Sequence, residues 1–225
     1  MQTTKKFTAK RGLAALAIAA SIAIPVSACS SSDSAGSDSS SASAPKPVAS
    51  IDALQGETTA IALDKGFTDA LTSLKLTPGV VGTAKLEDGS LIFPITGGNV
   101  TVFKPGEVSP YVIGQIQHEG SGLSLTAGGT KVELTNFNVD PGVSRVYGDV
   151  TVNGEVAATN AFLFQLDGRT LKPLETEGNT AILEGTKVEI SADAAPLLNQ
   201  TFNTDAVKPG LLVGIAKITV NTTSK

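Results

Sequence analysis

Four side chains in this sequence could do chemistry that most side chains cannot. The chain holds one Cys, one His, two Tyr and no Trp, and these are Cys29, His118, Tyr111 and Tyr147. A thiol can be acylated, an imidazole can act as a base or ligate iron, and a phenolate can ligate iron. Zinc and iron sites normally need several converging His, Cys or acidic ligands, so this composition predicts no metal site.

No catalytic motif surrounds these residues. The sequence contains neither a G-x-S-x-G nucleophile elbow nor a D-x-D-x-D-G calcium loop, and its Gly pairs fall in predicted hairpin turns. Residues 136–141, Asn-Phe-Asn-Val-Asp-Pro, offer oxygen ligands for a cation, but such a segment more often forms an Asx turn. We therefore predict that this protein is not an enzyme.

The start of the chain has the pattern of an export signal. Residues 1–11 carry four basic side chains and no acid, and an apolar run follows from Gly12 to Val26. That run is about 15 residues long, whereas a membrane-spanning helix needs roughly 20. A basic start, a short apolar stretch and small residues after it are typical of a cleaved secretory signal, here residues 1–28.

The segment Val26-Ser27-Ala28-Cys29 resembles the lipobox of bacterial lipoproteins. The resemblance implies that the Cys29 thiol receives a diacylglyceryl group and that the chain is cut just before it. An ordinary signal followed by a chance Cys is the alternative. Because two or more acyl chains anchor stably, we expect the protein on the extracytoplasmic face of the cell membrane, with the membrane as a partner through Cys29.

The composition changes twice after the anchor. Residues 29–50 are rich in Ser, Ala, Asp and Pro and predict a flexible tether, because they hold too little apolar surface to form a core. Residues 51–225 predict one β-rich extracytoplasmic domain. The whole chain carries a net charge of −4, and loss of the four bases of residues 1–28 makes it −8, which argues against nucleic acid as a partner.

Within residues 51–225, apolar and polar side chains alternate at period two, and turn residues separate the runs. We expect hairpin turns at residues 96–99, 128–129 and 153–154, and a further turn at residues 167–168. The predicted fold is mostly β, an antiparallel β-sandwich of hairpins.

Two short helices complete the predicted fold. Asp64 can cap a helix over residues 65–74, and Ser191 can cap one over residues 192–202. The sequence around the first helix, residues 61–86, is similar to residues 188–218 around the second. This similarity indicates a weak pseudo-two-fold repeat, with chance likeness of simple β sequence as the alternative.

The predicted strand 111–118 carries two of the chemically useful side chains. Tyr111 and His118 differ by an odd number of positions, so we expect them on opposite faces unless a bulge at Gly114 intervenes. His118 precedes the Gly-rich segment 119–122, which predicts a strand end. We expect a solvated turn histidine there, with a ligand site as the alternative.

Residues 117–123, Gln-His-Glu-Gly-Ser-Gly-Leu, resemble the H-x-G segment of the HtaA-type domain of actinobacterial haem-uptake proteins. Residues 145–150 look like the strand that follows in that family, and residues 191–210 occupy the place of its closing helix. The resemblance implies a haem-binding fold with His118 at the site. The family's iron-ligating Tyr would fall at position 70, where this chain has Ala70, so haem is a candidate cofactor without its expected ligand.

Three functions follow from these observations. The leading one is a non-enzymatic surface module that binds a small molecule or an envelope protein and needs no cofactor. The second is a haem-binding lipoprotein in iron acquisition that uses His118 with Tyr111 or Tyr147. The third is a structural or adhesive envelope protein, which an enclosed apolar pocket would argue against.

Overall fold

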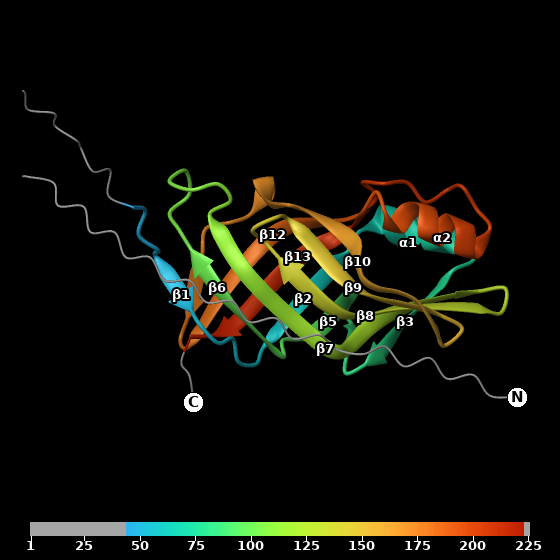
Figure 1. Cartoon of the computed structure of the whole chain (residues 1–225), viewed down its shortest axis with the longest axis horizontal. Coiled ribbons are helices and arrows are strands. Elements are labelled where there is room, and N and C mark those ends of the chain that lie inside the picture. Colours follow the sequence, from blue (N-terminus) through green and yellow to red (C-terminus); the bar gives the residue numbers. More distant parts are fainter. Residues whose placement is uncertain (1–43, 223–225) are drawn as a thin grey trace, which may run out of the picture. The chain divides into compact units, whose positions relative to one another are not determined.

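Antiparallel strands account for most of residues 44–222, the part of the chain that the computed structural model describes (Figure 1). The elements are β1 Ala49–Ile51, β2 Thr58–Leu63, α1 Lys65–Ser73, β3 Thr77–Gly82, β4 Lys85–Glu87, β5 Ser90–Pro94, β6 Gly97–Val102, β7 Val112–Ala127, β8 Thr130–Asp140, β9 Arg145–Val152, β10 Glu155–Asp167, a 3-10 turn Gly168–Thr170, β11 Glu175–Glu177, β12 Thr180–Ile190, α2 Ala194–Phe202 and β13 Leu212–Asn221. The predicted signal, Cys29 and most of the predicted tether lie outside the described residues.

The strands form one strongly curled sheet. Its main order is β1-β6-β7-β8-β9-β10-β12-β13-β2-β5-β4, and β3 and β11 pair with β7 and β12. Only Ile95 and Thr96 separate β5 from β6, so this stretch pairs with β2 on one side of the corner and with β7 on the other. The two ends of the sheet are therefore held together, and one face of the sheet is enclosed.

The fold class agrees with the prediction: the described residues are mostly β and antiparallel, curled into a sandwich-like body with two helices. The predicted hairpins at residues 128–129 and 153–154 are confirmed, because Ala127 pairs with Thr130 and Val152 with Glu155. These are short turns whose Gly and Asn residues define them locally.

The predicted hairpin at residues 96–99 is wrong, and the turn at residues 167–168 is present but does not close a hairpin. Residues 96–99 do not close a hairpin, because β5 and β6 change partners at this corner, and the real turn is Asp88-Gly89 between β4 and β5. Residues 167–168 begin a 3-10 turn, and β10 pairs with β12 rather than with the next strand. Both errors concern pairing between distant segments.

Both predicted helices are present at one end of the sheet (Figure 1). The Asp64 side chain caps α1 by accepting a hydrogen bond from the backbone N–H of Gly66 at 2.7 Å. Helix α2 begins two residues later than predicted, at Ala194, whose N–H donates to the Ser191 hydroxyl at 2.9 Å. Neither helix has the length and apolarity that a membrane crossing requires, and no other helix among residues 44–222 has them.

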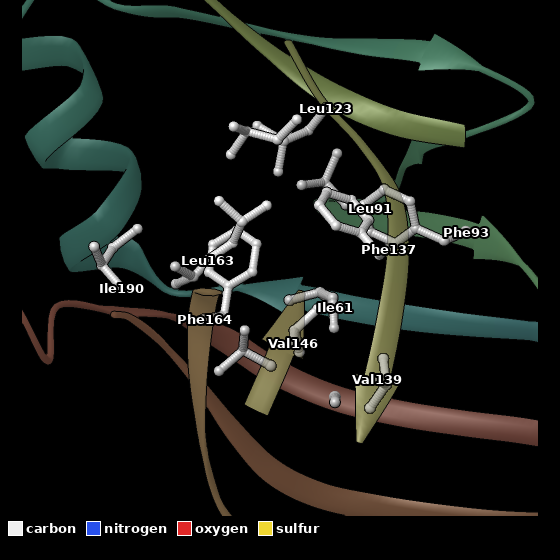
Figure 2. Close-up of a cluster of buried hydrophobic side chains, with 14 of the residues drawn as sticks. Ile61, Leu91, Phe93, Leu123, Phe137, Val139, Val146, Leu163, Phe164 and Ile190 are labelled. Carbon is white, nitrogen blue, oxygen red and sulfur yellow. The ribbon is translucent and has the colours of Figure 1, made fainter. Parts of the chain in front are cut away.

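Apolar side chains from alternate strand positions fill the enclosed face. Three phenylalanines, Phe93, Phe137 and Phe164, pack edge to face with ring centroids 5.2 and 5.9 Å apart, and Figure 2 shows them among Ile61 and Val146. Edge-to-face packing brings the positive ring edge to the negative ring face and is favourable beyond the area it buries.

A row of register irregularities crosses four neighbouring strands, in the pairs β7–β8, β8–β9 and β9–β10. Asn136 has a left-handed backbone with φ of 53°, its amide oxygen accepts from Gly120 N–H at 3.0 Å, and its amide nitrogen donates to Asp149 at 2.9 Å. The same carboxylate accepts from Asn160 N–H at 3.0 Å. These bonds satisfy backbone groups that the broken ladder leaves free.

In the oxygen-rich segment 136–141, Asn136 and Asp140 have hydrogen-bond partners, whereas the buried Oδ1 of Asn138 has none among the described residues. Asp140 accepts a hydrogen bond from the backbone N–H of Val143 at 3.3 Å, three residues on, whereas an Asx turn would bond two residues on. No group of three His, Cys, Asp or Glu side chains within residues 44–222 is placed to hold a metal ion.

Candidate functional site

An apolar cavity of about 180 Å³ lies inside the curled sheet. Strands from every part of the sheet contribute to its wall, with side chains that are mostly aliphatic or phenylalanine. Among those that line it are Ile61, Phe93, Ile116, Val139, Phe164 and Ala216. Protein interiors contain few voids larger than a water molecule, so a cavity of this size is an uncommon feature.

One end of the cavity is buried and the other is partly exposed. His118 and Leu123 line the buried end, on the side of the two helices. At the opposite end, the lining includes Tyr111 and Leu174, which are only partly buried. We call this end the mouth. Figure 1 shows that β1, which also lines the cavity, lies at the end of the sheet away from α1 and α2.

His118 is built into the cavity wall. Its side chain is 1% exposed, its Nδ1 lies 2.9 Å from the backbone oxygen of Pro94, and its Nε2 lies 3.1 Å from the hydroxyl of Thr59. A carbonyl only accepts, so Nδ1 carries the proton and donates it, and Nε2 accepts from the Thr59 hydroxyl. Burial lowers the pKa of His118, and the bond to Pro94 opposes this in part.

The expectation of a solvated turn histidine is thus wrong. Strand β7 does not end at His118 but continues to Ala127 through an irregularity at residues 119–121. The histidine lies on the inner face and joins three strands, because Thr59 is on β2 and Pro94 on β5. With both ring nitrogens engaged, it has none free to ligate iron or to take a proton from a substrate.

Tyr111 lies at the mouth and shares the cavity with His118. Burial raises the pKa of its phenol. The expected placement on opposite faces is wrong because β7 begins at Val112, so strand alternation does not extend to Tyr111. Within β7 there is no bulge at Gly114, because the pairing of β7 with β6 continues without a shift. Val112 and His118 both point inward, as strand alternation requires.

Tyr147 belongs to a different face of the molecule. It lies on the outer face of β9, with its ring centroid 6.0 Å from that of Phe162. The Arg145 guanidinium lies 4.5 Å from the centre of the Phe162 ring and donates to the Tyr147 hydroxyl at 3.4 Å. Of the three predicted ligand residues, His118 and Tyr111 line the cavity at its opposite ends, and Tyr147 lies outside it.

Sequence reasoning missed other parts of this site. Ala49 and Ile51 line the cavity, although Ala49 lies in the predicted tether. Thr59 was also missed, yet alternation along β2 places it on the same face as Ile61, which is the signal that could have found it. The cavity as such has no local signal, because its walls come from strands distant in sequence.

No protein-family model and no curated protein sequence matches this chain. Solved structures are similar to it in fold. The C-terminal domain of HtaA from Corynebacterium glutamicum matches with a TM-score of 0.52 and 14% identity, over 75% of this chain and 98% of that one. The N-terminal domain of the same protein matches at 0.46 and 12%, over 77% and 100%. The haem-binding protein HtaB from C. glutamicum matches at 0.45 and 9%, over 77% and 96%. The first match shows a shared fold, as the resemblance in the sequence implied.

Proposed function

We propose that this domain is a non-enzymatic binding module that holds a small apolar molecule in the cavity inside the curled sheet. The cavity is the observation that carries the proposal. Its volume of about 180 Å³ exceeds that of an engineered apolar cavity of about 150 Å³ that binds benzene. A ligand that fills it gains the contacts that the empty wall lacks.

The module is proposed to work outside the cell, held by an acylated Cys29 at the outer face of the cell membrane. The basic start, the apolar run and the lipobox-like segment 26–29 support this placement. Its ligand or partner is then met at the envelope, and nucleic acid is not expected among its partners because the mature chain is acidic.

A catalytic role is not proposed, although Thr59 and His118 have the separation of a nucleophile and its base, 3.1 Å. Acyl transfer also needs free N–H donors to stabilise an oxyanion. Strand β2 pairs with β13 on one side and β5 on the other, so the backbone N–H groups around Thr59 are used in the sheet. We therefore assign the hydrogen bond between Thr59 and His118 a structural role in the cavity wall.

Binding of N-phenyl-1-naphthylamine, whose fluorescence rises in apolar surroundings, tests the proposal. We expect saturable binding that is weakened about tenfold or more by Ala216→Leu, which fills the cavity from β13. The matched control is Ala62→Leu on the exposed face of β2, which should leave affinity unchanged. Equal binding by both variants, or none by the wild type, would overturn the proposal.

Haem is a second candidate, favoured by the HtaA-type resemblance and by the fold shared with the HtaA domain. The residues of the cavity wall fit it poorly, because both ring nitrogens of His118 are engaged and position 70 is Ala70. The phenol of Tyr111 at the mouth is the cavity-lining group that could ligate iron. A Soret shift on adding hemin that Tyr111→Phe abolishes would favour haem over an apolar molecule, and no shift would dispose of it.

The structural or adhesive role stands as the third candidate. It would be favoured if neither the apolar probe nor hemin binds to the folded protein.

A further inference from the structure

We infer that the ligand is a long acyl chain that enters the cavity tail first through the mouth. This inference rests on the proposed function and names the chemical class of its ligand. Three features of the described residues carry it: the length of the cavity along its strands, the absence of charge in its wall, and the exposed apolar side chains on segments that contribute to its mouth.

The cavity extends along the strands that line it. On β12 the lining residues run from Ala181 to Val188, and on β13 from Val213 to Val220. Seven steps along a strand span about 23 Å at roughly 3.3 Å each. An apolar space that extends this far along two neighbouring strands suits a long hydrocarbon chain.

The wall of the cavity carries no Asp, Glu, Lys or Arg. Its polar side chains are few, and the two deepest, Thr59 and His118, are hydrogen-bonded to each other. An ionised group buried there would lack a partner and would lose its hydration without compensation. The ligand must therefore place its hydrocarbon inside and keep any polar head at the mouth, next to Tyr111.

Apolar side chains are exposed on three segments that also contribute residues to the cavity wall. Val48 precedes β1 and is 61% exposed, Val143 is in the β8–β9 turn and is 54% exposed, and Ile113 near the start of β7 is 38% exposed. Residues Pro141 and Ser144 of the same turn line the cavity. Val143 therefore exposes an apolar side chain between two residues that line the cavity.

The proposed lipid anchor at Cys29 is separated from Val48 by a short stretch of sequence. The nineteen steps from Cys29 to Val48 span at most about 70 Å when fully extended. An anchor at Cys29 therefore keeps the mouth within that distance of the membrane. The acyl chain can come from a membrane lipid or from the group on Cys29 itself, and both sources present the same hydrocarbon.

A homologous series of straight-chain alcohols from butanol to dodecanol tests the chemical class. Displacement of N-phenyl-1-naphthylamine is measured on residues 29–225 carrying Cys29→Ser, which contain the whole compact unit 43–225. We expect about fourfold tighter binding for each added CH₂ until the cavity is full, and no gain beyond that length. Ala216→Leu should reach its limit at a shorter chain than wild type, and Ala62→Leu should not.

The outcomes separate this inference from the proposed function. Probe binding without dependence on chain length, or tighter binding of naphthalene than of decanol, would overturn the acyl chain and leave an apolar ligand site. Absence of probe binding would overturn both.

Native mass spectrometry distinguishes the two sources. The soluble Cys29→Ser protein is incubated with phosphatidylglycerol vesicles, and we expect one lipid to be retained after the vesicles are removed. Val143→Asp at the mouth should slow this uptake about tenfold, whereas Val156→Asp, at a side chain 69% exposed on the distant β9–β10 hairpin, should not.

A second arm uses the protein acylated at Cys29. If its cavity holds its own acyl chain, it does not bind the naphthylamine probe, while the Cys29→Ser protein does. If the soluble protein takes no lipid from vesicles and the acylated protein still binds the probe, neither source supplies an acyl chain and the inference is wrong.

Discussion

At the scale of the residue, His118 makes the stability of this protein depend on pH. Its imidazole is neutral in the folded state, and burial lowers its pKa below 6.5, the ordinary value that applies when the chain is unfolded. Below pH 6.5 the unfolded state therefore binds more protons than the folded state, and stability falls as the pH falls. We expect a loss of at most about 1.4 kcal/mol per pH unit from this group as the pH falls from 6.5 towards its lowered folded-state pKa, measured by urea unfolding.

His118→Gln isolates this effect from the titration of carboxylates. The amide keeps a donor and an acceptor near Pro94 and Thr59 but cannot be protonated in this range. The variant should be less stable at pH 7.5 and should show a shallower fall between pH 6.5 and 5. Parallel pH curves for the two proteins would contradict a neutral, buried His118.

At the scale of the element, the stability of the irregular strand pairs from β7 to β10 depends on Asn136. Its side chain makes two hydrogen bonds across the sheet, and its backbone is left-handed. Asn136→Gly should lower the free energy of unfolding by about 1–2 kcal/mol through the lost bonds. Asn136→Ala should lower it by roughly 1 kcal/mol more, because Ala strains a left-handed position that Gly tolerates. Urea unfolding measures both, and equal losses would show that the backbone strain is relieved elsewhere.

The helices, turns and strands also show which features of the fold could be predicted from the sequence. The cap of α1 by Asp64 and the turn at Asn153-Gly154 were predicted because their signals lie within a few residues of one another. The corner at Ile95 and Thr96 was not, because Gly and Asn residues there mimic a hairpin while the strand partners lie far away in the sequence. His118 was misplaced for a related reason, since the Gly residues after it form an irregularity inside a long strand.

At the scale of the whole molecule, the location of the protein depends on one atom. If the sulfur of Cys29 carries two acyl chains, the exported protein stays with the membrane, because each buried CH₂ contributes about 0.8 kcal/mol. Cys29→Ser should release the protein into the medium and abolish incorporation of radiolabelled palmitate. Retention of the variant on washed membranes would point to an anchor other than this thiol.

The cavity also connects ligand binding to the stability of the entire fold. A molecule that binds only the folded state stabilises it by about 2.7 kcal/mol at a concentration one hundred times its Kd. For a domain of this length, that gain raises the Tm by roughly 5–10 °C. With decanol as the ligand, we expect this shift in wild type and in Ala62→Leu, measured by circular dichroism because the chain has no Trp.

Ala216→Leu should behave in the opposite way. Its added methyl groups occupy space that is empty in the wild type, so the variant should be more stable without ligand by about 0.5–2 kcal/mol. It should also lose most of the shift that decanol causes, because ligand and side chain compete for the same volume. A destabilised variant that still responds fully to decanol would mean that the ligand binds outside the curled sheet, and the cavity would then be no more than a packing defect.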